Sequence, residues 1–418
     1  MLKKVINLGI LLIMVFLGCL AQKNQTNQLN PIKADDLMQG ITPASVGVVN
    51  LDKPFIDGVA NFSVELFKNS FSSKENSLIS PTSVLLALAM TTNGARSTTL
   101  SQMEAVIGGG LSIQELNKYL YSYVKKLPSE DKSILNIANS IWFRDKGFDV
   151  KQDFLQTNAD YYGAAAYKSA FDNGTVKDIN NWVKKNTDGL IDSIIDDISS
   201  DAIMYLINTV LFDAEWYEKY ETSAVRDRQF TAFDGTKQTV KFMHSNEYRY
   251  LESDSAKGFI RPYFDNKYSF VALLPDENIS INEYVASLTG GTFMNIVNNA
   301  WGTRVIAALP KFEYDYEITM NGALQTMGMT DAFCPIAADL SNIGTAWGNL
   351  FISEVKHKTF ITVDERGTKA AAVTSVGVDV TSVQPQPKIV TLDRPFVYAI
   401  IDNETKLPIF IGTIMALK

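Results

Sequence analysis

The stretch SEVKHKTFITVDERGTKAAAVTSVGVDVT, residues 353–381, alternates between two kinds of side chain over nearly its whole length. Successive side chains of a β-strand point to opposite faces, so such an alternation predicts a strand with two different faces. One side of the first half carries Lys356 and Lys358. The other side is mostly apolar and consists of Val355, His357, Thr359, Ile361 and Val363. We therefore expect a strand with one buried face.

A second alternation follows the polar turn at residues 364–367. Its odd-numbered side is mixed and includes Lys369, Val373 and Asp379. Its even-numbered side is small or apolar throughout: Thr368, Ala370, Ala372, Thr374, Val376, Val378 and Val380. A strand that slides into a packed interior needs a face of this kind. The residues alone also allow an ordinary hairpin with the preceding strand, and both interpretations stay open at this point.

Farther from this stretch, other segments rich in β-branched and aromatic residues predict strands at 137–143, 203–212, 268–274 and 304–309. The chain closes with a predicted hairpin of residues 395–402 and 407–414. Ser80-Pro81 supplies a capping side chain and a proline at the first helical position, so a helix should begin there. Residues 84–90 are apolar all round and predict that this helix is buried. Helices first and long strands later predict an α+β fold.

The N-terminal residues predict an export signal. Lys3 and Lys4 precede an apolar run of residues 5–17, which is shorter than the roughly 20 residues that span a bilayer as a helix. Phe16-Leu17-Gly18-Cys19 resembles the lipobox of bacterial lipoproteins, although leucine is usual where Phe16 stands. We expect a signal peptide at 1–18, acylation of Cys19, a disordered lipidated tether at 19–45 and a folded domain at 46–418. Plain secretory cleavage nearby is the alternative.

The composition narrows the possible functions. A net charge of −8 and the lack of a basic cluster interleaved with aromatic residues argue against nucleic acid as a partner. The two histidines, His244 and His357, offer little from which to build a catalytic triad, and no metal-ligand spacing is present. We therefore expect no enzyme, no metal and no cofactor. We expect a monomer that is exported to the outer membrane or cell surface, alternatively secreted, and that touches a membrane only through its lipid.

At Glu365-Arg366-Gly367-Thr368-Lys369-Ala370-Ala371-Ala372 the sequence resembles the hinge of the serpins, a family of serine protease inhibitors. The resemblance extends over most of the chain after residue 45. It includes Asn76-Ser77-Leu78-Ile79-Ser80-Pro81-Thr82-Ser83, Ile179-Asn180-Asn181-Trp182, Leu309-Pro310-Lys311-Phe312 and Arg394-Pro395-Phe396. It implies about nine helices and three mostly antiparallel sheets, with an exposed reactive loop from Gly367 to about Pro387.

The resemblance also implies roles for particular residues. A protease attacks the loop, and the freed strand inserts into the main sheet beside Val355–Val363. The hinge residues are then Glu365, Gly367, Thr368, Ala370, Ala371 and Ala372. Four residues belong to the cluster where the sheet opens: Ser83, Asn208, Trp216 and His357. Lys369, where the family usually has glutamate, lies on the outward side of the predicted strand.

The usual family spacing from Glu365 places the scissile bond at Thr381-Ser382. The flanking residues of the bait are Val378, Asp379, Val380 and Val383. A small β-branched residue before the bond suits a shallow, apolar specificity pocket, so we expect an elastase-like or subtilisin-like target. The predicted function is irreversible inhibition of serine proteases, with cysteine proteases as a further class. The alternatives are a non-inhibitory binding protein of serpin fold and, less favoured, a surface hydrolase.

Overall fold

The computed structural model describes residues 31–127, 132–345, 349–368 and 386–417. Residues 33–418 make up one compact unit. Its helices are α2 (Lys53–Ser70), α3 (Pro81–Thr92), α4 (Ser97–Gly108), α5 (Ile113–Lys126), α6 (Gln152–Tyr162), α7 (Asn173–Asn186), α8 (Ile281–Ser287), α9 (Gly290–Asn298) and α10 (Asn321–Thr326). Two short 3-10 helices, η1 (Thr222–Ala224) and η2 (Asp331–Phe333), complete the set for the described residues.

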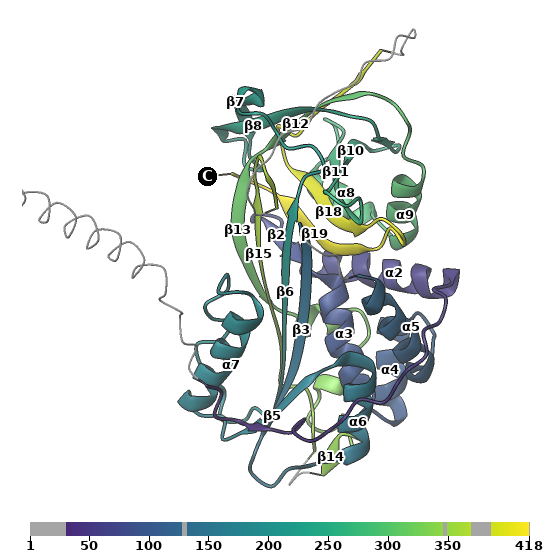
Figure 1. Cartoon of the computed structure of the whole chain (residues 1–418), viewed down its shortest axis with the longest axis vertical. Coiled ribbons are helices and arrows are strands. Elements are labelled where there is room, and N and C mark those ends of the chain that lie inside the picture. Colours follow the sequence, from purple (N-terminus) through teal and green to yellow (C-terminus); the bar gives the residue numbers. More distant parts are fainter. Residues whose placement is uncertain (1–30, 128–131, 346–348, 369–385, 418) are drawn as a thin grey trace, which may run out of the picture. The chain divides into compact units, whose positions relative to one another are not determined.

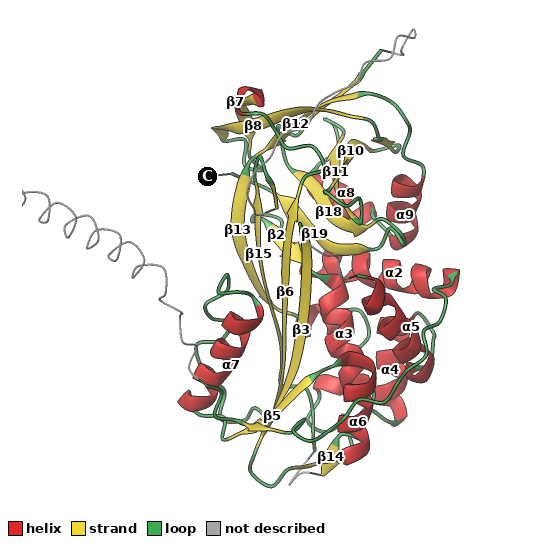
Figure 2. Ribbon diagram, in the orientation of Figure 1, coloured by secondary structure: helices red, strands yellow, loops and turns green. Residues whose placement is uncertain are grey.

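The strands form three large sheets and one small one (Figure 2). The main sheet has the order β1 (Asp35–Asp36), β5 (Ala165–Ser169), β3 (Ser133–Arg144), β6 (Met204–Glu215), β15 (Glu354–Val363) and β13 (Phe312–Thr319), and β16 (Gly367–Thr368) pairs with β6. Within it, β3 pairs parallel with β5 and β15 pairs parallel with β6, whereas the other pairs are antiparallel.

The six-stranded sheet has the order β2 (Ser77–Ile79), β19 (Pro408–Ile414), β18 (Phe396–Asp402), β11 (Tyr268–Pro275), β10 (Ala256–Pro262) and β9 (Tyr250–Glu252). The four-stranded sheet has the order β17 (Lys388–Thr391), β12 (Val305–Pro310), β8 (Lys237–Glu247) and β7 (Val225–Thr231). β14 (Gly344–Thr345) and β4 (Asp149–Val150) make a small pair. The expected α+β fold with mostly antiparallel sheets is confirmed.

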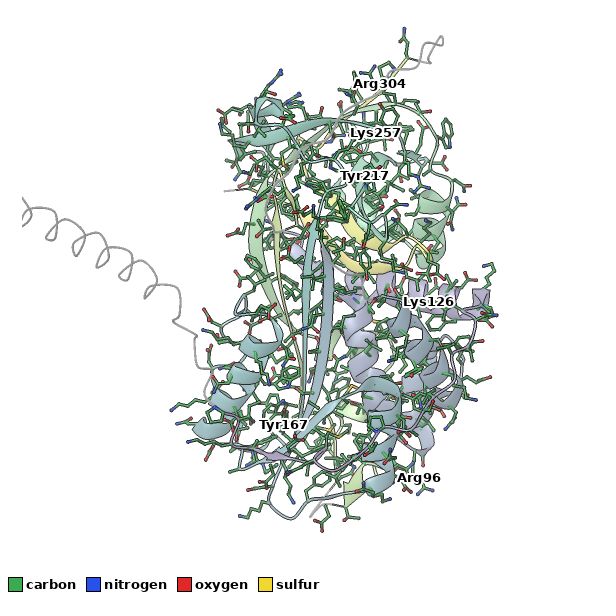
Figure 3. The ribbon with its side chains drawn as sticks, viewed as in Figure 1. Arg96, Lys126, Tyr167, Tyr217, Lys257 and Arg304 are labelled. Atoms are coloured by element: carbon green, nitrogen blue, oxygen red, sulfur yellow. The ribbon has the colours of Figure 1, made fainter. Side chains whose placement is uncertain are left out.

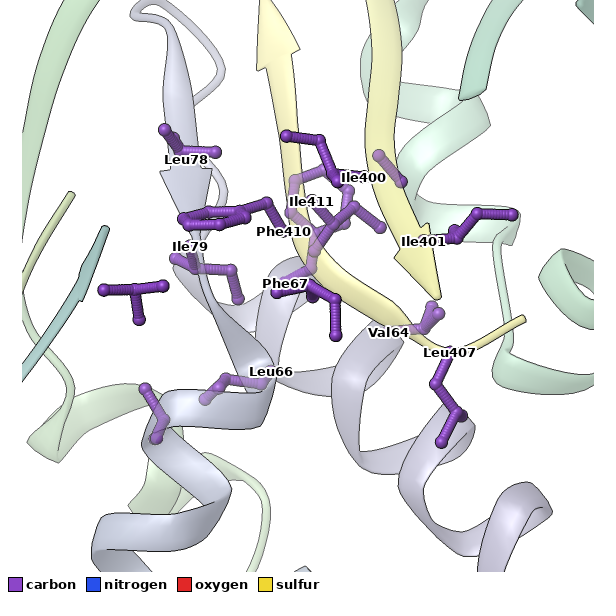
Figure 4. Packing of buried hydrophobic residues seen from close by; sticks show 14 of the residues in the cluster. Val64, Leu66, Phe67, Leu78, Ile79, Ile400, Ile401, Leu407, Phe410 and Ile411 are labelled. Carbon is purple, nitrogen blue, oxygen red and sulfur yellow. The ribbon is translucent and has the colours of Figure 1, made fainter. Parts of the chain in front are cut away.

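The hydrophobic core lies between α2, α3 and the six-stranded sheet. Figure 4 shows Val64 and Phe67 of α2 facing Ile400 of β18 and Phe410 of β19, and all four side chains are buried. Helix α3 begins where the sequence predicts, because the Ser80 side chain accepts from the Ser83 N–H and Pro81 occupies the first turn. All of its residues are buried, as the apolar run predicts.

Two helices flank the middle of the main sheet. In Figure 1, α3 and α7 lie on opposite sides of β3 and β6, and both helices contact β6. Trp182 and Val183 of α7 are buried, which is what an amphipathic helix achieves when it covers a sheet. The central strands of the main sheet are therefore covered on both faces, so any strand added there enters a packed interior.

The predicted boundary at residue 46 is wrong for the last part of the proposed tether. β1 pairs antiparallel with β5 at Asp35–Lys168 and Asp36–Tyr167. The Asp178 carboxylate accepts from the backbone N–H groups of Lys33 and Ala34, at 2.9 and 2.8 Å. These contacts supply hydrogen-bond partners for the backbone of residues 33–36. The folded unit therefore begins near residue 33.

Candidate loop-insertion site

The main sheet is incompletely paired between β6 and β15. Their ladder runs from the Glu354–Tyr205 pair to the Lys358–Thr209 pair. Beyond it, β15 continues to Val363 and has no β6 partner in the described part of the chain. At the far end of β6, β16 pairs antiparallel with it, Gly367 opposite Glu215 and Thr368 opposite Ala214. A gap in strand pairing is thus bounded below by the parallel ladder and above by the hinge.

Gly367 is required at the hinge by geometry. Its φ is +155°, and a Cβ placed there would lie 2.0 Å from the Ala214 carbonyl oxygen. Only glycine permits so close an approach of two backbones. The expectation that the loop leaves the body at Gly367 is therefore wrong by two residues, since Gly367 and Thr368 already pair with β6.

A polar contact with Tyr263 holds Thr368 of β16 in place. Its side chain is 3% exposed, and its hydroxyl lies 2.9 Å from the Tyr263 hydroxyl. Tyr263 in turn stacks on Trp216, with ring centroids 4.6 Å apart and planes 9° from parallel. Burial raises the pKa of Tyr263, so its hydroxyl keeps its proton. A small hydroxyl residue fits this place, whereas a larger or charged side chain does not.

Trp216 ties the hinge turn to the top of β6. Its indole Nε1–H donates to the Asp364 carbonyl at 2.8 Å, and its backbone N–H donates to the Arg366 carbonyl at 2.9 Å. Glu365, the predicted first hinge residue, pairs with Lys311 at 2.8 Å. Partial burial opposes ionisation of Glu365, but the hydrogen bond and charge of Lys311 lower its pKa overall. The turn is thus fixed by Trp216, directly after β6, and by Lys311, between β12 and β13.

A polar cluster lies at the upper end of the parallel ladder. His357 is fully buried and pairs in register with Asn208. The Ser80 N–H donates to His357 Nε2 at 3.0 Å, so Nδ1 carries the proton and donates to Asn208 Oδ1. Burial lowers the pKa of His357 to about 3, which keeps the ring neutral. The Asn208 amide donates to the Ser83 carbonyl at 3.5 Å.

The structure therefore brings Ser83, Asn208 and His357 together and places Trp216 separately, against the hinge. The remaining predicted hinge residues, Ala370, Ala371 and Ala372, lie outside the described residues. So do Cys19, the reactive bond Thr381-Ser382 and the flanking residues Val378, Asp379, Val380 and Val383.

Sequence reasoning missed the support behind Trp216. Arg261 is 4% exposed, donates to Glu247 and lies 3.9 Å above the Tyr220 ring and 5.0 Å from the Trp216 ring. Burial opposes the charge of Arg261, yet the Glu247 carboxylate raises its pKa overall. The partners are far apart in sequence, so no local pattern marks them.

The described residues contain no group of three or more histidine, cysteine or acidic side chains placed to hold a metal ion. They also contain no helix with the length and apolar character that crossing a membrane requires.

The family model described as Serpin (serine protease inhibitor) matches residues 57–417. The chain belongs to the serpin family, which includes protease inhibitors and whose members are generally not enzymes themselves. It is 30% identical to an uncharacterized serpin-like protein of Thermococcus kodakarensis, with 96% of each chain covered. It is 29% identical to the leukocyte elastase inhibitor of Xenopus laevis, covering 84% of this chain and 96% of the relative.

Solved structures agree. The chain is 56% identical to tengpin, a thermophilic serpin, and the native-state structure of tengpin covers 92% of this chain and 100% of its own with a TM-score of 0.89. The latent-state structure of tengpin gives a TM-score of 0.80, with 89% and 100% covered. Thyroxine-binding globulin, 23% identical, shares the fold with a TM-score of 0.76 over 86% of this chain and 98% of its own.

Proposed function

We propose that this serpin inhibits serine proteases irreversibly, and cysteine proteases as a further class, by inserting its cleaved loop between β6 and β15. The observation that carries the proposal is β16, because the first two residues after the turn already pair antiparallel with β6 above the gap. Addition of an extended strand to a sheet is a known use of backbone hydrogen bonding. Here the added strand would come from the chain itself.

If the register of β16 continued along β6, Ala370 would lie opposite Phe212, Ala372 opposite Val210 and Thr374 opposite Asn208. Directly opposed residues of an antiparallel pair share a face. Phe212 contacts the rings of Tyr263 and Tyr268, so that face is the interior one. The small, even-numbered residues of the loop would therefore enter the core, which supports the proposal.

Insertion would have to open the closed part of the sheet. The five register pairs from Glu354–Tyr205 to Lys358–Thr209 would separate, and so would the hydrogen bond between His357 and Asn208. The same register carries the loop down to Val378 opposite Met204, the first residue of β6. The new strand gains partners on both sides, at about 1 kcal/mol net per hydrogen bond.

Buried valines add to the gain. Val376 and Val378 would each contribute about 1.5 to 3 kcal/mol on burial. A gain of this kind is comparable to the typical domain stability of about 5–15 kcal/mol, so insertion would be able to deform a protease that is covalently attached to the moving end.

The chemical step belongs to the protease. Its serine Oγ attacks the carbonyl carbon of Thr381, the bond to the Ser382 nitrogen breaks, and that nitrogen leaves as an amine with the proton taken from the serine. An ester then joins Thr381 to the protease. Insertion removes the ester from the protease's catalytic groups before water can hydrolyse it.

We propose an elastase-like or subtilisin-like target. Thr381 and its valine neighbours suit a shallow apolar pocket, and the similarity to leukocyte elastase inhibitors supports the same class. The test is incubation with one protease of each class, followed by a denaturing gel and mass spectrometry. We expect a covalent complex joined through Thr381. A cut outside residues 378–383 would show that the predicted reactive bond is wrong.

The same gel separates the alternative, a binding protein that is cleaved without trapping. For that protein we expect loop cleavage, an active protease and no covalent complex. The hinge favours inhibition, because Thr368, Ala370 and Ala372 are all small.

We further propose that the chain is exported and anchored by a lipid on Cys19, as in bacterial lipoproteins. The support is the lysine-led apolar run that ends at Gly18-Cys19. The Cys19→Ala variant should leave the membrane fraction. An unchanged membrane fraction would contradict the proposal.

A further inference from the structure

The four-stranded sheet exposes one face beside the attachment of the loop. β17 starts at Lys388, a few residues beyond the proposed reactive bond, and pairs parallel with β12. Figure 1 places β7, β8 and β12 together at one end of the molecule. A protease bound at Thr381-Ser382 would therefore lie close to this sheet.

Two isoleucines form an apolar pair on the exposed face. Ile389 of β17 and Ile306 of β12 are direct neighbours in register, and they are 62% and 39% exposed. Their neighbours along the two strands, Val305, Ala307 and Val390, point to the other face and are fully buried. Apolar side chains thus occupy both faces of these strands, although only one face meets the core.

Three arginines lie on the same face of this sheet as the apolar pair. Arg304 is exposed, and its Nε–H donates to the side chain of Asn246, which is the register neighbour of Ile306. Arg226 and Arg228 of β7 are also exposed. They pair in register with Phe242 and Val240, which share a face of β8 with His244 and Asn246. Burial lowers the pKa of His244, and the charges of Arg228 and Arg226 lower it further.

The three arginines keep their charge uncompensated. Within the described part of the chain none of them forms an ion pair. The acid of β7, Asp227, pairs instead with Lys241 at 2.9 Å, and Lys388 lies 3.8 Å from Glu252. A chain with a net charge of −8 therefore has exposed arginines without ion pairs on the same sheet face as an apolar pair.

We propose that Ile306, Ile389, Arg226, Arg228 and Arg304 form a second docking surface for the protease that is engaged at the loop, and that this protease carries acidic residues beside its active site. The inference rests on the proposed function for the position of the protease. Charge complementarity of this kind raises association rates and makes them dependent on salt. The apolar pair supplies a desolvated centre within a polar rim.

The arginines are tested by the second-order rate constant of loop cleavage, measured with the serpin in excess over a subtilisin-like or an elastase-like protease at several NaCl concentrations. The triple variant Arg226→Ala, Arg228→Ala and Arg304→Ala should react about tenfold more slowly at low salt and lose most of its salt dependence. The matched control is Arg96→Ala, Lys118→Ala and Lys126→Ala, which removes the same charge. Figure 3 shows Arg96 and Lys126 away from Arg304. The control should react like the wild type.

The apolar pair is tested by Ile306→Ser with Ile389→Ser, which should slow cleavage severalfold at every salt concentration. Ile336→Ser is its control, because Ile336 is 92% exposed and lies in the segment between η2 and β14. Equal rates for wild type and both docking variants, or a wild-type rate that rises with salt, would overturn the docking surface.

Covalent complex formation is measured separately on the same samples. If cleavage depends on the arginines and no complex accumulates, the docking surface stands and trapping fails. If a complex accumulates at the same rate in all variants, trapping stands and the docking surface is wrong.

Discussion

The six-stranded sheet and the main sheet are built on different principles. Every described pair of the six-stranded sheet is antiparallel, and its interior is aromatic and aliphatic, as around Phe410 in Figure 4. At the centre of the main sheet, β6 and β15 are parallel and paired over five residues only, and the buried side chains there include the polar cluster of Ser83, Asn208 and His357. We call this junction of β6 and β15 the seam.

The seam is weak for identifiable reasons. Buried polar groups stabilise a fold only when all their hydrogen bonds are made. At the seam, Thr209 Oγ1 and Ser83 Oγ are buried and have no hydrogen-bond partner within the described part of the chain. A hydrophobic junction of the same size would cost more free energy to separate. Separation of the seam breaks a few polar contacts, and the inserted strand would replace them with new backbone hydrogen bonds.

The largest effect should come from blocking the seam. Thr368→Arg places a charge where a hydroxyl meets Tyr263 in a buried position, at a cost of several kcal/mol. The variant should be cleaved at the same bond while the protease survives, so covalent complex should fall more than a hundredfold on a denaturing gel. Thr368→Ser, as a control, should still trap. Trapping by the arginine variant would contradict insertion from this point.

The six-stranded sheet should respond by losing stability instead. Phe410→Ala removes a side chain that is 2% exposed, which costs about 3–5 kcal/mol of unfolding free energy. Chemical denaturation measures the loss. Phe233→Ala is the control, since Phe233 is 43% exposed, and it should cost less than about 1 kcal/mol. Comparable losses would mean that the core does not lie in this sheet.

The seam should also be sensitive to acid. The pKa of His357 is about 3 in the folded chain and 6.5 for an ordinary histidine. Between pH 6.5 and pH 3 this histidine binds a proton in the unfolded chain but not in the folded chain. The contribution of His357 to the free energy of unfolding is therefore fully present above pH 6.5 and is lost as the pH falls toward 3. The wild type should lose about 1.4 kcal/mol per pH unit more than His357→Gln between pH 6 and 4. Parallel pH profiles of the two proteins would rule out a buried neutral histidine.

The smallest effect concerns the unpartnered hydroxyl at the seam. Thr209→Val keeps the shape of a fully buried side chain and removes a polar atom without a partner. We expect a stabilisation of up to about 1 kcal/mol, together with a higher ratio of cleavage to trapping because the seam separates less readily. Thr222→Val, at an exposed position in η1, serves as the control. Destabilisation by Thr209→Val would indicate that the hydroxyl has a partner.

The fold could be predicted where the signal is local. The predicted strands at 137–143, 203–212, 268–274 and 304–309 correspond to β3, β6, β11 and β12, because burial and β-propensity coincide in them. The capping signal at Ser80-Pro81 likewise fixed the start of α3. Such features depend on neighbours a few residues apart.

Long-range pairing could not be predicted in this way. β1 consists of two aspartates, which have no preference for strands, and it is ordered by Asp178 through residues 33 and 34. The alternation after Gly367 is the same whether the segment is free or paired, so sequence could not place β16 on β6. Tyr263, Arg261 and Glu247 meet the hinge only through tertiary contacts.

Heat stability before and after cleavage tests insertion at the seam most directly. The loop is nicked with a protease at catalytic concentration, and the melting temperature of the intact and nicked wild type is compared with that of nicked Thr368→Arg. We predict a large rise for the nicked wild type, because the freed strand pairs with β6 and β15, and no rise for the variant. An unchanged melting temperature in the nicked wild type would contradict the account.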